Sequence, residues 1–215
     1  LENIKIQTNI IEASWRFGVR RLLFLGSSCI YPKFAIQPIN EDQLLQGKLE
    51  ETNEMYAIAK IAGIKLCEAL RTQYNFDAIS LMPTNLYGPG DNYNLHSSHV
   101  FAALIKKFYE ASFYGYKNVS CWGDGSPLRE FLHVDDLGDA VVFSLEKWDP
   151  SNIKTAPCNK NNKPYLYLNV GTGKVISIKN LAIKISNEFK FKGNIIWDKT
   201  KPNGTPIKQL DISNI

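Results

Sequence analysis

The chain has 215 residues, of which 44% are hydrophobic and 21% charged, and its formal net charge is +4. This composition is ordinary for a globular protein with one large or two small domains. The basic residues are dispersed rather than clustered, so we expect no nucleic acid as a partner. No apolar run is long enough to span a bilayer, and we expect no membrane partner either.

The four cysteines are far apart in the sequence and form no C-x-x-C pair, so we expect no zinc or other metal site. So few cysteines in a chain of this size are typical of a reducing compartment, which predicts a cytoplasmic protein.

The chain opens with a helical pattern over residues 4–17, and Gly18 is placed to end that helix. Residues 20–25 are a short apolar run, typical of a buried parallel strand. Residues 32–52 are polar and predict a long loop.

Thr52 or Asn53 can cap a helix that continues to about residue 74. The next strand is predicted over residues 77–82, and Pro83 closes it. Helix, strand, helix and strand therefore alternate. This order predicts an α/β fold, a Rossmann-like doubly wound parallel sheet.

The second half contains shorter elements and more turns. Asp135 is expected to cap one of its helices, and residues 149–164 are expected to form an exposed, mobile loop. The predicted helices are 99–113, 136–147 and 177–189, the predicted strands are 119–122, 129–134, 165–170 and 194–197, and the predicted turns are 123–127 and 201–206.

Hydroxyl, thiol, phenol and ammonium groups stand at informative positions in the first half. Ser27 and Cys29 directly follow a strand, and Tyr56 and Lys60 are four residues apart, so they share one helix face. The charge of Lys60 is expected to lower the pKa of Tyr56. The phenol could then exchange a proton with a carbonyl or alcohol oxygen near neutral pH.

The carboxyl ends of parallel strands form the usual ligand crevice, and residues 83–90 are expected there beside Ser27 and Cys29. The glycine-rich turn that usually holds a dinucleotide is missing. Gly171-Thr172-Gly173 is interpreted as a turn that leads to a Ser177 helix cap. Because the chain also starts at Leu1, we expect it to be a fragment that lacks its first strands.

Six segments carry a resemblance to a known family. They read G-S-S-C-I-Y-P at 26–32, Y-A-I-A-K-I-A-G at 56–63, P-T-N-L-Y-G-P at 83–89, S-H-V at 98–100, R-E-F-L-H-V-D-D at 129–136 and K-P-N-G-T-P at 201–206. On these motifs the chain resembles the extended short-chain dehydrogenase/reductase family, except over residues 149–164. It is most similar to members that epimerise and reduce a GDP-linked keto sugar.

The resemblance implies an NADP-dependent conversion of GDP-4-keto-6-deoxy-D-mannose to GDP-L-fucose. The C4 ketone acidifies the hydrogens on C3 and C5, so each inversion needs one group to remove a proton and another to return one. The resemblance implies Cys29 as the base and His99 as the acid. It also implies that Tyr56 protonates the C4 oxygen during hydride transfer, that Ser27 hydrogen-bonds this oxygen, and that Lys60 holds the nicotinamide ribose.

The same resemblance implies the residues that bind the NADP(H) cofactor and the GDP-sugar substrate. The cofactor positions are Leu25, Gly26, Ser27, Ser28, Tyr56, Lys60, Pro83, Thr84, Asn85, Leu86 and His99. The substrate positions are Lys107, Trp122, Arg129 and Lys208. Lys107 stands where the family often has arginine, which keeps the charge but loses bidentate geometry.

By resemblance we expect two domains and a homodimer. Residues 1–90, completed by 165–180, are expected to form a partial NADP-binding domain, and 91–164 with 181–215 a substrate domain. Family members often dimerise through two helices, here residues 3–17 and 53–74.

Simpler interpretations stay open. Taken alone, Cys29 is a buried thiol and His99 a polar residue at a helix start, while His133 is a structural histidine. The alternatives for the whole chain are another NAD(P)-dependent sugar-nucleotide epimerase or dehydratase, and an inactive fragment that only binds partners.

Overall fold

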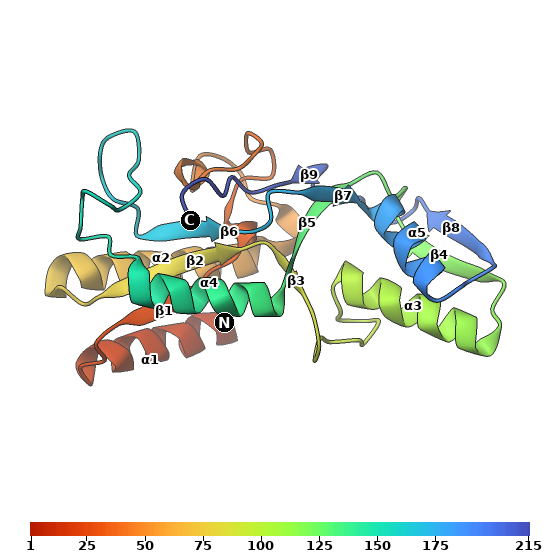
Figure 1. Ribbon diagram of the computed structural model, residues 1–215, viewed down its shortest axis with the longest axis horizontal. Helices are drawn as coiled ribbons and strands as arrows, with labels where there is room; N and C mark the ends of the chain where they lie inside the picture. The colour runs from red at the N-terminus through yellow and green to blue at the C-terminus, as the bar shows by residue number, and fades with distance from the viewer.

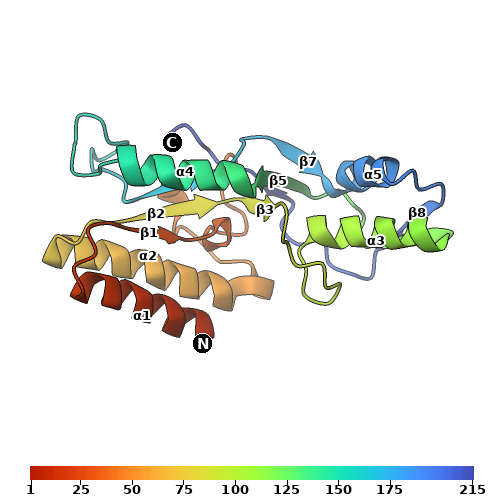
Figure 2. The same cartoon turned by 60° about the horizontal axis from the view of Figure 1, so that its bottom comes forward.

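The computed structural model describes residues 1–215 as an elongated molecule with two parts (Figure 1). The larger part contains a three-stranded parallel sheet in the order β1–β2–β6. Helices α1 and α2 cover one face of this sheet, and α4 covers the other (Figure 2). This arrangement confirms the predicted α/β fold. The bounds are Leu22–Leu25 for β1, Ala78–Pro83 for β2, Tyr167–Val170 for β6, Glu2–Arg16 for α1, Glu54–Tyr74 for α2 and Val134–Lys147 for α4.

The smaller part packs α3 and α5 on the parallel pair β4–β8. Strand β5 runs between the two parts, parallel to β3 and β9 and antiparallel to β7. No helix is both long and apolar enough to cross a membrane. The bounds are Val100–Tyr114 for α3, Ile178–Glu188 for α5, Asn118–Trp122 for β4, Asn194–Asp198 for β8, Leu128–His133 for β5, Asn85–Tyr87 for β3, Ile207–Lys208 for β9 and Val175–Ser177 for β7.

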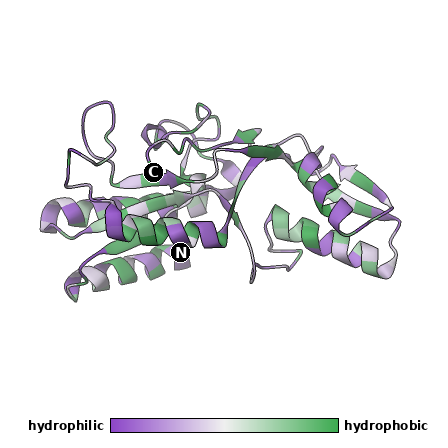
Figure 3. Cartoon of the chain, in the orientation of Figure 1, coloured by the Kyte–Doolittle hydropathy of each residue, from purple (hydrophilic) through white to green (hydrophobic).

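Strand β2 lies at the centre of the larger part, between β1 and β6, and all six of its residues are therefore buried. Ile79 and Leu81 pack toward α4 in one core cluster, whereas Met82 belongs to another. A strand covered on both faces is expected to be mostly apolar, and Ser80 is the one polar residue of β2. Figure 3 shows the hydrophobic colouring gathered on the strands and the helices beside them, while the loop between α4 and β6 is largely polar.

The structure corrects two expectations from the sequence. Helix α4 begins at Val134, and its cap is His133, whose Nδ1 accepts the N–H of Asp135 at 3.2 Å. The prediction that Asp135 caps this helix is therefore wrong, and the imidazole takes that role. The strands β3, β7 and β9 were not predicted, because each is two or three residues long and depends on pairing with the distant strand β5.

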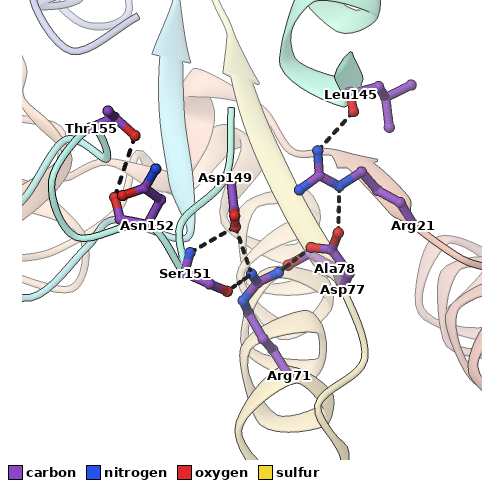
Figure 4. A network of polar contacts seen from close by, with 9 residues as sticks. All are labelled: Arg21, Arg71, Asp77, Ala78, Leu145, Asp149, Ser151, Asn152 and Thr155. Carbon is purple, nitrogen blue, oxygen red and sulfur yellow. Dashed lines mark hydrogen bonds and ion pairs between the residues drawn. The ribbon is translucent and has the colours of Figure 1, made fainter. Parts of the chain in front are cut away.

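A network of polar contacts surrounds Asp77, which directly precedes the first residue of β2 (Figure 4). Its carboxylate pairs with Arg21 at 2.5 Å and with Arg71. Arg71 also donates to Ser151 Oγ at 2.8 Å, so the start of the 149–164 loop is attached to α2. Burial would raise the pKa of Asp77, but the two guanidinium groups outweigh burial and lower it.

We predict that Asp77→Asn destabilises the fold by about 1–2 kcal/mol at pH 7, less than a fully buried pair because the carboxylate is 32% exposed. The lowered pKa means that Asp77 stabilises the fold fully above its ordinary value near 3.8 and loses this contribution as pH falls through the folded-state value. The difference in the free energy of unfolding between the variant and the native chain should therefore become smaller in acid. Urea unfolding at pH 7 and below pH 4 measures it.

Glu12→Gln is the matched control, because Glu12 and Arg16 form an exposed pair within α1. It should change the free energy of unfolding by less than about 0.5 kcal/mol. Equal losses in the two variants would contradict the structural role of the Asp77 network.

Candidate functional site

The carboxyl ends of β1, β2 and β6 meet at one edge of the sheet, as parallel strands require. The Gly26 N–H donates to the carbonyl of Leu81 at 2.8 Å, and the Thr84 N–H to that of Val170 at 3.0 Å. A Cβ at Gly26 would collide with the Met82 thioether, so any larger residue there would require the buried Met82 side chain to shift. This edge presents Ser27 and Cys29.

The sulfur of Cys29 is surrounded by donors and positive charge. Ser27 Oγ accepts the Cys29 N–H at 3.2 Å and thereby caps the short 3₁₀ helix Ser28–Ile30. Asn53 Nδ2 and Lys208 Nζ each donate to Cys29 Sγ at 3.4 Å. Arg129 is close enough that the charge of Cys29 acts on its pKa. Two hydrogen-bond donors and a guanidinium group thus face the sulfur.

Tyr56 faces the same two residues from α2. Burial raises the pKa of its phenol, the charge of Cys29 raises it further, and a hydrogen bond with Ser27 acts in the opposite direction. Lys60 Nζ donates to the carbonyl of Leu25 at 2.9 Å and lies 5.8 Å from the Tyr56 ring centroid. Burial lowers the pKa of Lys60. The expectation that Lys60 lowers the pKa of Tyr56 is therefore wrong, because the ammonium is held by the backbone and the phenol is desolvated.

Strand pairing supplies the cationic side of the site. The register of β5 and β9 places Arg129 opposite Lys208. Burial lowers the pKa of Arg129, while the charges of Glu50 and Cys29 raise it. The 201–206 turn covers these groups, since Thr205 Oγ1 donates to Glu50 Oε2 at 3.4 Å.

Three predicted residues lie outside this cluster. His99 is exposed at the N-cap of α3, and no hydrogen bond or ion pair joins it to Cys29. Lys107 Nζ donates to the carbonyl of Ser120 at 2.8 Å. Trp122 is 63% exposed at the end of β4, with Lys201 Nζ 5.6 Å from its ring centroid. The 201–206 turn therefore contacts Trp122 through Lys201 and approaches Arg129 at Gly204.

The remaining cofactor positions surround the carboxyl end of β2. Thr84 Oγ1 and Asn85 Nδ2 donate to the carbonyl of Glu130 at 3.2 and 2.8 Å. Ser28 and Pro83 are buried, and Leu86 packs against the core.

The Gly171–Gly173 turn is occupied by protein groups. Its Thr172 and Gly173 N–H groups both donate to Glu130 Oε1, at 2.5 and 2.7 Å, so they are not free to hold a phosphate. Ser177 caps α5 by accepting the Asn180 N–H, which confirms the predicted turn and cap. The residues present thus fit the nicotinamide-ribose end of a dinucleotide, through Lys60 and Tyr56, and provide no glycine-rich phosphate cradle.

Sequence reasoning missed Glu130 as a structural residue and Asn53 as a neighbour of the thiol. Glu130 is fully buried and also accepts the Leu210 N–H at 2.8 Å. Its signal was available, because Glu130 lies on the same face as Leu132 in the strand predicted over residues 129–134. Asn53 was considered only as a helix cap, yet its side chain makes no capping bond.

Comparison with known proteins gives a consistent result. Residues 1–155 match the model of the NAD dependent epimerase/dehydratase family. The chain is 53% identical over 214 residues to a probable GDP-L-fucose synthase 1 of Oryza sativa subsp. japonica, which covers 99% of the chain and 61% of that relative. The chain spans 61–62% of the length of the first three curated relatives it matches.

Solved structures share the fold. A GDP-6-OMe-4-keto-L-xylo-heptose reductase from C. jejuni superposes with a TM-score of 0.90 at 32% identity, covering 99% of this chain and 68% of that one. A GDP-L-fucose synthetase from Naegleria fowleri bound to NADP superposes with a TM-score of 0.82 at 26% identity, covering 97% and 63%.

We predict that Glu130→Gln destabilises the fold by about 3 kcal/mol, because a buried acceptor of three backbone N–H groups is replaced by a side chain that is half donor. Urea unfolding measures the loss. Glu188→Gln, at an exposed position in the last turn of α5, is the control and should change stability by less than about 0.5 kcal/mol. A loss below about 1 kcal/mol in Glu130→Gln would show that the three bonds are dispensable.

Proposed function

This chain belongs to the NAD dependent epimerase/dehydratase family, and we propose that the full-length protein converts GDP-4-keto-6-deoxy-D-mannose to GDP-L-fucose. The observation that carries the proposal is the convergence of Ser27, Cys29 and Tyr56 at the carboxyl edge of the parallel sheet. The names of the curated relatives support the same substrate class.

The proposed epimerisation moves protons only. The Cys29 thiolate removes the proton from C3 or C5, the electron pair delocalises onto the C4 ketone oxygen, and His99 returns a proton to the opposite face. Two such exchanges invert both centres, and each leaves the ketone unchanged. The hydrogen bonds that Asn53 Nδ2 and Lys208 Nζ donate to Sγ support a role for Cys29 in the site. In this proposal the sugar ring lies between Cys29 and His99, so no bond between the two residues is required in the free chain.

The proposed reduction uses the phenol as an acid. Bound NADPH supplies a hydride to C4. Tyr56 gives its proton to the C4 oxygen, and Ser27 donates a hydrogen bond to that oxygen. The balance is one NADPH and one proton consumed per ketone reduced. A raised pKa keeps Tyr56 protonated at neutral pH, as a proton donor must be. The NADP in the similar Naegleria fowleri structure supports this choice of cofactor.

The nucleotide of the substrate would lie along the residues that come from β5, β9 and the smaller part of the molecule. Arg129 and Lys208 offer positive charge for the diphosphate, and Trp122 and Lys107 border the other end. We propose a dinucleotide part that holds 1–90 and 165–180, as predicted from the sequence. The packing of Leu137 and Trp148 with β2 supports moving residues 134–148 from the substrate part to this part.

We also propose a cytoplasmic homodimer. The exposed apolar residues Ile6 and Ile10 on α1 and Ile58 on α2 support association through these two helices. Their side chains are 58%, 55% and 44% exposed. The four free cysteines support a reducing compartment.

A second candidate is a C4 reductase that does not epimerise. One observation favours it: the GDP-6-OMe-4-keto-L-xylo-heptose reductase superposes with a TM-score of 0.90. Incubation of the full-length protein with GDP-4-keto-6-deoxy-D-mannose and NADPH in D₂O separates the two. The proposed activity oxidises NADPH and incorporates deuterium at C3 and C5, whereas a simple reductase oxidises NADPH without this exchange. Absence of NADPH oxidation would reject both.

We predict that Tyr56→Phe lowers the rate of NADPH oxidation by a factor of about 10²–10⁴, because the phenolic proton is lost, while deuterium exchange continues. Cys29→Ser should have the opposite effect, so that the rate of deuterium exchange falls more than the rate of NADPH oxidation. Stopped-flow absorbance and mass spectrometry measure the two rates. Identical losses of both rates in both variants would contradict the division of roles.

A further inference from the structure

Asn53 occupies a helix N-cap but does not act as a cap. It directly precedes α2, where an asparagine side-chain oxygen usually accepts a backbone N–H of the first turn. Here the side chain makes no capping bond. Its Nδ2 instead donates to Cys29 Sγ at 3.4 Å. The residue thus gives up a local interaction for a contact with the thiol 24 positions earlier.

The other end of the Asn53 amide is unpartnered. Its Oδ1 is buried from solvent and has no hydrogen-bond partner. A buried amide oxygen without a partner is unfavourable, and natural proteins rarely retain one without a reason. Because Nδ2 of the same amide lies on Sγ, Oδ1 is also close to the thiol.

We propose that Asn53 is a positioning residue for Cys29 and a substrate contact. Its Nδ2, together with Lys208 Nζ, holds the sulfur of Cys29 in place through hydrogen bonds, and its Oδ1 accepts a hydroxyl of the bound hexose. Sγ therefore has two donors from separate parts of the chain, one at the start of α2 and one on β9. The role of Cys29 as a base rests on the proposed function. The contact between Asn53 and the sulfur does not.

The first test measures the thiol alone. Full-length protein is treated with iodoacetamide at pH 7.5, and peptide mass spectrometry follows alkylation of Cys29. Cys158 is also partly accessible and serves as the internal reference, whereas Cys67 and Cys121 are buried. Asn53→Asp keeps the size of the side chain and the preference for an N-cap but removes the donor. It should slow alkylation of Cys29 about tenfold relative to Cys158.

Asn40→Ala is the matched control for Asn53→Ala. Asn40 is also an asparagine N-cap without a capping bond, and its Oδ1 is also buried and unpartnered, but it makes no contact with Cys29. Alkylation of Cys29 should slow about tenfold in Asn53→Ala and stay unchanged in Asn40→Ala. Native alkylation rates in both Asn53 variants would overturn the proposal, whether or not the protein turns over the sugar.

The second test separates the two ends of the amide. Asn53→Asp retains an acceptor, so deuterium exchange at C3 and C5 should fall about tenfold with little change in KM. Asn53→Ala loses donor and acceptor, so the same fall should come with a raised KM. The dissociation constant of NADPH should not change in either variant. If native protein shows no exchange, the proposed function fails and alkylation alone decides the role of Asn53. An unchanged KM in Asn53→Ala would overturn the hydroxyl contact.

Discussion

The carboxylate of Glu130 is the constraint on which the site depends. One oxygen accepts the N–H groups of the turn after β6, and the other accepts the Leu210 N–H just beyond β9. The backbone carbonyl of the same residue accepts Thr84 and Asn85 from the end of β2. A single buried residue therefore joins three segments that are far apart in sequence. Arg129 and Lys208 are close in sequence to the residues that make these bonds. The buried bonds therefore fix the backbone positions from which the two cationic side chains extend.

A second buried carboxylate orders the long polar segment before α2. Glu41 accepts the Asn169 N–H at 2.9 Å and the Asn214 amide at 2.8 Å, and burial raises its pKa. Asn169 in turn accepts the Tyr31 hydroxyl at 2.7 Å. The loop, β6 and the last residues of the chain are thus held together by polar bonds inside the core. Such a network is favourable only when each member is satisfied, so it specifies one arrangement of the loop around the thiol.

The sequence predicted what depends on local pattern and missed what depends on distant partners. The alternation of helix and strand predicted the central strand at residues 77–82, and Ser27 and Cys29 were expected just past the carboxyl end of a strand, where β1 ends. Strands β7 and β9 exist only through pairing with β5, which no short window reveals. The direction of the pKa shift on Tyr56 was missed for a similar reason. Helical spacing places Lys60 near the phenol, but only the fold shows that its ammonium is bound to Leu25.

The electrostatics assign opposite tasks to two groups that are close together. Asn53 Nδ2 and Lys208 Nζ donate to Cys29 Sγ, whereas burial and the charge of that sulfur favour retention of the proton on Tyr56. Each state supports the other, because a negative sulfur makes a second negative charge on the phenol less favourable. A base and an acid can thus coexist in one site at one pH. Negative charge that developed on a substrate oxygen beside the phenol would make that oxygen a better proton acceptor, which would favour proton transfer from Tyr56 as the ketone is reduced.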